Sequence, residues 1–128
     1  MTRDLRTAPA SLVVWGALAL MREHDIRHLL VMDGPRLAGV LSNRDFRKLL
    51  EHVDADGVIR RFRETPVADI MTPGARIVTA EPDTPIREIA EAVIRHRIGC
   101  VPIVDVSGAV VGILTQKDVL AALLRDAR

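Results

Sequence analysis

The stretch that decides the fold is IREIAEAVIRHRIGCVPIVDVSGAVVGILTQKD, residues 86–118, because residues 14–45 carry a second version of it, VWGALALMREHDIRHLLVMDGPRLAGVLSNRD. Met21 aligns with Val93 at an offset of 72 residues, and Gly39 aligns with Gly112 at an offset of 73. The increase in offset from 72 to 73 indicates that the second copy has one more residue than the first, in a turn between these positions. Two copies of one supersecondary unit, each too small to bury its own apolar face, are expected to pack together about a pseudo-twofold axis.

Length and composition indicate a globular chain with a real core. The 128 residues are 48% hydrophobic and carry a formal net charge of +1, so no global field draws the protein to nucleic acid or anionic lipid. The apolar run of residues 12–21 is shorter than the roughly 20 residues that span a bilayer. A single cysteine, Cys100, permits no internal disulfide and favours a reducing compartment, for which the cytoplasm is the default.

The periodicity of each copy predicts a strand, a helix, two strands and a second helix. Thr84 followed by Pro85 suits the cap and first residue of the helix in the second copy, and Ser11 suits the cap of the corresponding helix in the first copy. Turns at Gly34 and Gly108 divide two hairpins of branched residues. The apolar positions at helical spacing are Val14, Ala17, Leu18 and Met21 in the first copy, and Ile86, Ile89, Ala90, Val93 and Ile94 in the second.

The segment between the copies has a different character and is interpreted as a linker. It contains the cluster Arg60-Arg61-Phe62-Arg63, and Thr65-Pro66 after it suits the start of a short helix that Pro73 ends. The expected division is therefore a first repeat at 1–55, a linker at 56–65 and a second repeat at 66–128.

Three phrases resemble the cystathionine-beta-synthase (CBS) domain family: residues 69–73 (DIMTP), 96–105 (HRIGCVPIVD) and 112–119 (GILTQKDV). Residues 24–33 and 39–46 carry the same signature in the first copy, with Leu30 where the family has proline, as at Pro102. The chain thus resembles a free-standing CBS pair, an α/β (α+β) fold. The resemblance implies a non-catalytic regulatory module that binds adenosine nucleotides or adenosyl compounds in clefts between the repeats and regulates a partner protein.

The chemistry of that implied site follows from Ser42-x-x-Asp45 and Thr115-x-x-Asp118, which stand where a strand ends and a helix begins. Carboxylates accept bonds from ribose hydroxyls, while hydroxyls and helix N-termini donate to phosphate. Arg44 and Lys117 add positive charge. The expected ligands are AMP, ADP, ATP or S-adenosylmethionine, with no cofactor required. The adenine slot is expected to be lined by Ile98, Val101 and Pro102 in one site, and by Ile26, Leu29 and Leu30 in the other.

Each of these features has a structural alternative. Ser/Thr followed three residues later by an acid is also a capping box, which stabilises a helix by about 1 kcal/mol, and capping does not exclude binding. Two potential zinc ligands per copy, His24 with His28 and His96 with Cys100, are too few for a closed metal site, and Cys100 is interpreted as a packed side chain.

Three classes of function remain open at this stage. They are a nucleotide sensor, a ligand-free interaction module, and nucleic-acid binding through the arginine cluster, for which Trp15, Phe46 and Phe62 supply few aromatic rings. The sequence contains neither a nucleophile elbow nor a phosphate-binding glycine-lysine loop, so we do not expect an enzyme. Apolar residues at 14–15 and 121–124 predict a homodimer of four repeats.

Overall fold

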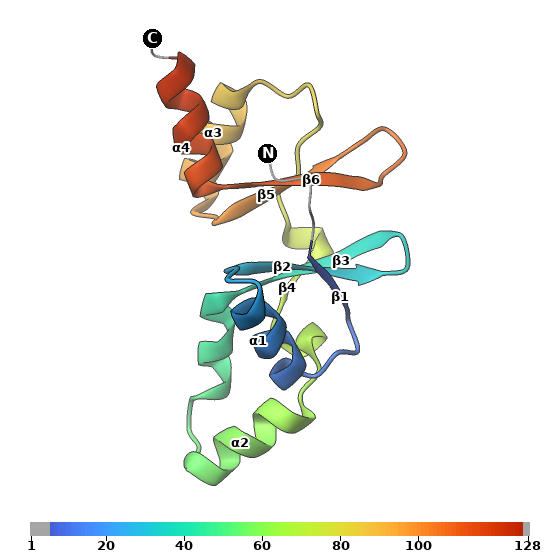
Figure 1. Cartoon of the computed structure of the whole chain (residues 1–128), viewed down its shortest axis with the longest axis vertical. Helices are drawn as coiled ribbons and strands as arrows, with labels where there is room; N and C mark the ends of the chain where they lie inside the picture. The colour runs from blue at the N-terminus through green and yellow to red at the C-terminus, as the bar shows by residue number, and fades with distance from the viewer. Residues whose placement is uncertain (1–5, 127–128) are drawn as a thin grey trace. The chain divides into compact units, whose positions relative to one another are not determined.

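The computed structural model describes residues 6–126, which form two compact units, 6–76 and 77–126. Both units mix helices with a small sheet, so the expected α+β class is confirmed (Figure 1). In each unit the α-helices lie on one side of the strands (Figure 1). Among the described residues, no helix is long and apolar enough to cross a membrane.

Unit 6–76 is built on a four-stranded sheet in the order β1-β2-β3-β4. β1 runs parallel to β2, and the other pairs are antiparallel. Helix α1 packs its buried positions Val14, Ala17 and Met21 against the core, which confirms the predicted helical stripe. The elements are β1 (Thr7–Pro9), α1 (Val14–Glu23), β2 (His28–Asp33), β3 (Arg36–Ser42), η1 (Asn43–Leu49), α2 (Ala55–Glu64), η2 (Val67–Asp69), β4 (Thr72–Pro73) and η3 (Gly74–Arg76), where η denotes a 3-10 helix.

Unit 77–126 repeats the helix, hairpin and helix of the first unit, with the second core between helices and hairpin. Its elements are α3 (Ile86–His96), β5 (Cys100–Val104), β6 (Val110–Thr115) and α4 (Gln116–Asp126). The first strand of the repeat is reduced to one parallel bridge between Ala80 and Ile103. Ala8 pairs with Val31 in the first unit at the same offset of 72 residues, so the repeat extends to strand register.

Proline explains why the first strand is short in the second unit. In the first unit the Leu30 N–H donates to the Arg6 carbonyl at 3.3 Å, and this bond extends the pairing of β1 with β2. Pro102 stands at the equivalent position and has no N–H, so the corresponding bond to the Val78 carbonyl cannot form. Pairing survives only at Ala80, whose N–H donates to the Pro102 carbonyl at 3.0 Å.

The predicted helix caps were wrong at both sites. α1 begins after Val13 with no side-chain cap, because the Val14 N–H donates to the Thr65 carbonyl at 2.8 Å instead. Thr84 accepts from the Glu81 N–H at 2.9 Å, which closes the preceding turn, and the cap of α3 is Pro85 in an extended conformation. Tertiary and turn hydrogen bonds therefore satisfy groups that the sequence pattern assigned to caps.

Residues 56–65, expected as a linker, form most of helix α2, which Asp54 caps through a 2.8 Å bond from the Gly57 N–H. Residues 66–76 pack on the first unit: Val67 and Ile70 enter its core, and β4 pairs with β3. Gly39 allows this approach, because a Cβ there would lie 2.7 Å from the Thr72 carbonyl oxygen. The sequence pattern of the second repeat thus begins within the first compact unit.

Candidate ligand-binding site

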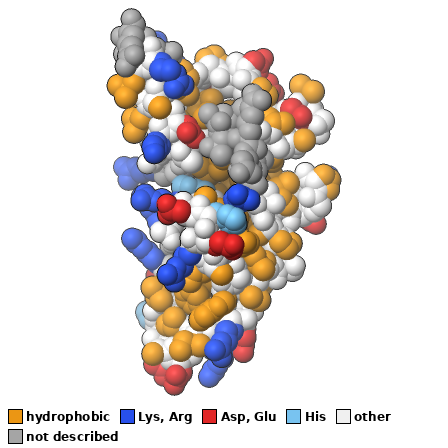
Figure 2. Space-filling model, viewed as in Figure 1, with side chains coloured by type: hydrophobic (Ala, Val, Ile, Leu, Met, Phe, Trp, Pro, Cys, Tyr) orange, Lys and Arg blue, Asp and Glu red, His pale blue; other side chains and the backbone are white. Residues whose placement is uncertain are grey.

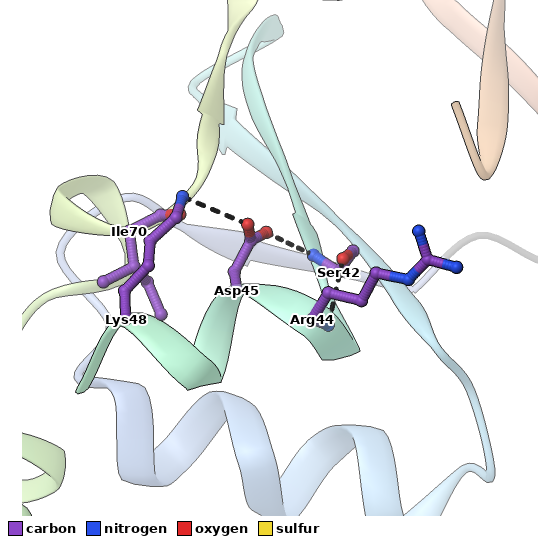
Figure 3. Close-up of polar contacts among 5 residues, drawn as sticks. All are labelled: Ser42, Arg44, Asp45, Lys48 and Ile70. Carbon is purple, nitrogen blue, oxygen red and sulfur yellow. Dashed lines mark hydrogen bonds and ion pairs between the residues drawn. The ribbon is translucent and has the colours of Figure 1, made fainter. Parts of the chain in front are cut away.

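The first junction, between β3 and η1, is a closed capping box (Figure 3). The Ser42 N–H donates to Asp45 Oδ2 at 2.7 Å, and the Arg44 N–H donates to Ser42 Oγ at 3.1 Å. Asp45 Oδ1 forms an ion pair with Lys48 at 3.2 Å, and the Lys48 ammonium also donates to the Ile70 carbonyl at 2.7 Å. Asp45 is 9% exposed, and both of its oxygens are engaged within the unit.

Arg44 is exposed, in contrast to the buried Asp45 next to it. Figure 3 shows its guanidinium extending away from the Asp45 carboxylate. The charge of Arg44 is therefore available to an anion, whereas that of Asp45 is held by Lys48.

The second junction, between β6 and α4, is a more open version of the same box. Asp118 Oδ2 accepts from the Thr115 N–H at 3.0 Å and from the Thr115 hydroxyl at 3.2 Å. The Asp118 N–H lies 3.4 Å from Thr115 Oγ1, so the capping is reciprocal. Within residues 6–126, no hydrogen bond or ion pair reaches Asp118 Oδ1.

The two junctions therefore differ in what they offer to a ligand. Asp118 keeps one carboxylate oxygen free and is half-buried, and Lys117 beside it is exposed. The helix that follows is also longer, because α4 spans 11 residues and η1 only seven. A longer α-helix with aligned peptide dipoles presents more positive potential at its N-terminus. The second junction therefore presents a carboxylate oxygen and an exposed cation together at a helix N-terminus.

The structure divides the expected adenine-slot residues into three groups. Leu29 and Val101 are fully buried in the cores of their units and support the strands from the helix side. Leu30 and Pro102 are also fully buried, but as the next residues on the same strands they point to the opposite face, where they pair across the hairpin with Val40 and Ile113. Ile26 and Ile98 are half-buried and pack against the edges of the cores.

The four candidate metal-ligating residues have different environments. His28 is half-buried, and its pKa is lowered chiefly by burial, which outweighs the opposing effect of Asp45. Burial raises the pKa of the Cys100 thiol to about 12. His96 is exposed and His24 half-buried. In the part of the chain that the structure describes, no three His, Cys, Asp or Glu residues are grouped to hold a metal ion.

The arginine cluster is partly engaged in packing helix α2. Arg61 donates to the Glu51 carbonyl at 2.8 Å, and the Arg63 guanidinium lies 6.0 Å from the centre of the Trp15 ring. Phe62 stacks on Phe46 with 6.0 Å between ring centroids. These contacts give the cluster a structural role.

One further hollow lies wholly in unit 77–126, with a volume of about 430 Å³. Glu81, Glu88 and Asp105 line it together with Val101, but none of Thr115, Lys117 and Asp118 does. Residues 78–81 line it as well, and of these Ala80 forms the parallel bridge to β5. The sequence analysis did not predict this hollow.

A tandem repeat of small α+β units, each ending a hairpin in a Ser/Thr-x-x-Asp junction, defines a class of paired ligand-binding modules. A family model described as the CBS domain matches residues 1–52 and 67–125. The chain therefore belongs to the CBS domain family, as its sequence resemblance indicated. Residues 67–76 belong to the second match and yet pack in the first compact unit.

Solved structures of CBS pairs match almost the whole chain. The CBSX2 protein of Arabidopsis thaliana, in complex with AMP, is 28% identical with a TM-score of 0.80, covering 100% of this chain and 95% of that one. The CBS domain pair of protein MJ0100, in complex with 5'-methylthioadenosine and S-adenosyl-L-methionine, is 26% identical with a TM-score of 0.80, covering 100% and 94%.

Curated relatives are longer than this chain. The uncharacterized protein MJ1225 of Methanocaldococcus jannaschii is 30% identical over 126 residues, which cover 94% of this chain and 44% of that protein. Inosine-5'-monophosphate dehydrogenase of Nitrosopumilus maritimus is 35% identical over 104 residues, which cover 80% of this chain and 19% of the enzyme. The chain thus spans less than half the length of these relatives.

Proposed function

We propose that this chain is a non-catalytic regulatory module that binds an adenosine nucleotide or adenosyl compound and thereby modulates a partner protein. The ligand contacts fall chiefly on the second junction: Asp118 accepts from ribose hydroxyls, and Lys117 and the N-terminus of α4 receive the phosphate or another polar group. Thr115, whose hydroxyl donates to Asp118 Oδ2, orients that carboxylate toward the ligand. Ile98, which is half-buried, supplies an apolar contact of the base. AMP, ADP, ATP and S-adenosylmethionine are the ligands to test.

The observation that carries this proposal is the free Oδ1 of Asp118, beside the exposed Lys117 and at the start of an 11-residue helix. A carboxylate that only caps a helix can have both of its oxygens bonded within the protein, and this is the case for Asp45. An acceptor and a cation at one helix N-terminus suit a ligand that carries both hydroxyls and a phosphate.

The relatives add support for the ligand class. AMP is bound in the CBSX2 structure, and 5'-methylthioadenosine and S-adenosylmethionine are bound in that of the MJ0100 pair. These three compounds share an adenosine moiety but not a phosphate. The ribose contact of Asp118 and the base contact of Ile98 are therefore proposed as common to all ligands, and the contact with Lys117 as specific to nucleotides.

Isothermal titration of the purified chain with AMP, ADP, ATP and S-adenosylmethionine tests the proposal. Binding at one or two sites per chain is the expected result. Lys117→Ala should weaken AMP and ATP more than S-adenosylmethionine, and Lys48→Ala serves as the matched control, because that lysine is held by Asp45 and the Ile70 carbonyl. If titration of none of the four compounds gave a heat of binding and none changed the Tm of the chain, the proposal of a nucleotide sensor would be contradicted.

If none of these compounds binds, the second candidate function is a ligand-free interaction module. The closed first junction favours this second candidate, because its capping bonds leave the Asp45 carboxylate with no free oxygen. Modulation of a partner requires that the ligand change the affinity between module and partner, so a pull-down of the partner with and without AMP distinguishes the two functions.

The proposed assembly is a homodimer in the cytoplasm. Exposed apolar side chains on the helices support association, among them Trp15 on α1 and Leu120, Leu123 and Leu124 on α4. Light scattering measures the mass, for which two chains are expected and one chain would contradict the proposal.

A further inference from the structure

The two junctions differ at the position three residues after their aspartates, which is Lys48 in the first copy and Ala121 in the second. The Lys48 ammonium lies 3.2 Å from Asp45 Oδ1 and donates to the Ile70 carbonyl at 2.7 Å, as Figure 3 shows. Ala121 is exposed on α4 and ends in a methyl group. The same position of the repeat therefore carries a cation that engages the carboxylate in one copy and a side chain that cannot engage it in the other.

The helix type of η1 favours the contact between Lys48 and Asp45. η1 is a 3-10 helix, in which side chains three residues apart lie directly above one another. In an α-helix such as α4, the residue three positions further on is rotated by about 60° from that line. The backbone of η1 thus places the Lys48 side chain over the Asp45 carboxylate, and the Ile70 carbonyl holds the ammonium there.

Little of the Asp45 carboxylate remains for another donor. The Ser42 N–H occupies Oδ2, Lys48 occupies Oδ1, and the Asp45 side chain is 12% exposed. At the second junction the Thr115 N–H likewise occupies Oδ2, but Oδ1 of the corresponding aspartate has no partner within residues 6–126. A ribose hydroxyl would have to displace an ammonium at the first junction and only solvent at the second.

We infer that Lys48 keeps the first junction closed to adenosyl ligands, so that the chain binds one ligand, at the second junction. This role of Lys48 rests on the proposed function, and it assigns the choice between two equivalent junctions to one residue. An ammonium makes a charge-assisted bond to the carboxylate, which is roughly twice as strong as the bond from a neutral ribose hydroxyl. Exchange of the ammonium for a hydroxyl is therefore unfavourable at Asp45, whereas Asp118 requires no such exchange.

The size of this effect depends on the environment of each group. The Lys48 side chain is 56% exposed, and a solvent-exposed ion pair by itself changes an affinity by at most about fivefold. The bond to the Ile70 carbonyl and the low exposure of Asp45 add to the closure, because a ligand must also reach a carboxylate that is nearly buried. We expect the closed junction to bind an adenosyl ligand at least about tenfold more weakly than the open one.

Adenosine is the probe that isolates the contact with the carboxylate, because it carries the ribose hydroxyls and no charge. Arg44, Arg47 and Lys48 are all exposed on η1, and Figure 2 shows basic side chains along the side of unit 6–76 where Figure 1 draws this segment in teal. The affinity of a phosphorylated ligand would change with any of these charges. With adenosine, a change in affinity reports the access of the hydroxyls to Asp45 or Asp118.

The first test opens the first junction in a chain whose second junction is disabled. Asp118→Ala should weaken adenosine binding at least about tenfold, and the further change Lys48→Met, which keeps an unbranched side chain without the charge, should raise the affinity again by about fivefold or more. Lys48→Arg in the same background is the matched control, because a guanidinium still pairs with Asp45 and should leave binding weak. In a chain with an intact second junction, loss of the Lys48 charge adds a site without altering the contacts of Lys117, so Lys48→Ala still serves as the control for Lys117→Ala there.

The second test places the same cation at the second junction. Ala121→Lys puts an ammonium three residues after Asp118, at an exposed position of α4 where circular dichroism should be unchanged. Adenosine binding should weaken by about twofold to fivefold, and the loss should shrink in high salt, because exposed ion pairs are screened. Ala121→Gln, which is long and uncharged, should bind adenosine like the wild type.

The outcomes separate the role of Lys48 from the proposed function. If the wild-type chain binds at one site that Asp118→Ala weakens, but neither Lys48→Met nor Ala121→Lys changes an affinity, then Lys48 does not close the first junction and the proposed function stands. Two sites of equal affinity in the wild-type chain would likewise overturn the closure. If neither the wild type nor any variant binds an adenosyl compound, both the closure and the proposed function are wrong.

Discussion

Asp45 and Asp118 occupy the same position of the repeat, and we expect their replacement by alanine to have opposite rank orders in stability and in ligand binding. Asp45→Ala should cost more of the free energy of unfolding, and Asp118→Ala should cost more of the affinity for an adenosyl ligand. A general defect in folding would lower stability and affinity in the same order for the two variants, so it would not explain a reversed order at equivalent positions.

The magnitudes follow from the contacts of each carboxylate. Asp45→Ala leaves the part-buried Ser42 N–H without an acceptor and releases the ion pair with Lys48. An orphaned polar group costs about 1–3 kcal/mol, and an exposed ion pair adds less than about 1 kcal/mol, so the loss is about 2–3 kcal/mol. Asp118→Ala removes an ordinary cap in a more exposed place, at a cost of about 1 kcal/mol.

Denaturant titration and thermal unfolding measure the first quantity. A loss of 2–3 kcal/mol corresponds to a decrease in Tm of about 8–12 °C, and a loss of 1 kcal/mol to about 4 °C. Titration with AMP measures the second, and there Asp118→Ala should weaken binding at least about tenfold, the effect of losing roughly 1.4 kcal/mol of charge-assisted hydrogen bonding. Asp118→Asn is the control, because its one remaining oxygen can still cap the helix while its NH2 group cannot accept from a ribose hydroxyl, so stability should be kept and affinity lost.

Three results would refute the reasoning. If Asp118→Ala were the more destabilising change, the free oxygen of Asp118 would not mean that this residue contributes less to stability than Asp45 does. If both variants bound AMP like the wild type, the junctions would serve capping alone. If Asp45→Ala impaired binding more than Asp118→Ala, the ligand would belong to the first junction.

Further predictions concern the strands, the thiol and the histidine. Leu30→Pro should lower the stability of the first unit by about 1–2 kcal/mol, because it removes the bond to the Arg6 carbonyl. Conversely, Pro102→Leu should supply the missing donor, and hydrogen exchange should then detect a protected amide at position 102; rapid exchange there would contradict our account of the short strand. Cys100 should not react with Ellman's reagent at pH 8 until denaturant is added, because its pKa is raised to about 12, and immediate reaction in the native state would show that it is accessible. The lowered pKa of His28 means that its neutral form is favoured in the folded state, so its stabilising effect is complete above the unfolded-state pKa of about 6.5 and is lost as the pH falls below it. His28→Gln should flatten this acid limb of the stability profile, and an unchanged limb would assign it to other groups.

Much of the architecture was predictable because its signals are local. The helical stripe of α1, most of that of α3, the two hairpins and the Ser/Thr-x-x-Asp boxes depend on residues three or four apart or on alternation along a strand. Ile94 is the exception: it was expected on the α3 stripe and is 77% exposed. The caps at Ser11 and Thr84 failed for the opposite reason. The group that accepts from the Val14 N–H is the Thr65 carbonyl, 51 residues further along the chain, and no local sequence pattern predicts this bond.

The candidate site shows the same division. The sequence identified both junctions and the cations beside them, and it left open whether their carboxylates cap a helix or bind a ligand. Lys48 pairs with Asp45 three residues before it, and the Ile70 carbonyl at 2.7 Å holds its ammonium in place. The corresponding position of the second copy is Ala121, so the Ser/Thr-x-x-Asp spacing is shared by both junctions but the cation that closes the first is not.

The sequence by itself determined the repeat, the order of helices and strands in it, and the family to which the chain belongs. Only the tertiary structure decided that residues 66–76 pack in the first unit, that α1 keeps an uncovered apolar face, and that Asp118 keeps a free oxygen. The physical reason is the range of the interactions. Periodicity and capping are set by neighbours in the chain, whereas strand pairing, burial and the occupation of a carboxylate depend on residues that folding brings together from distant positions.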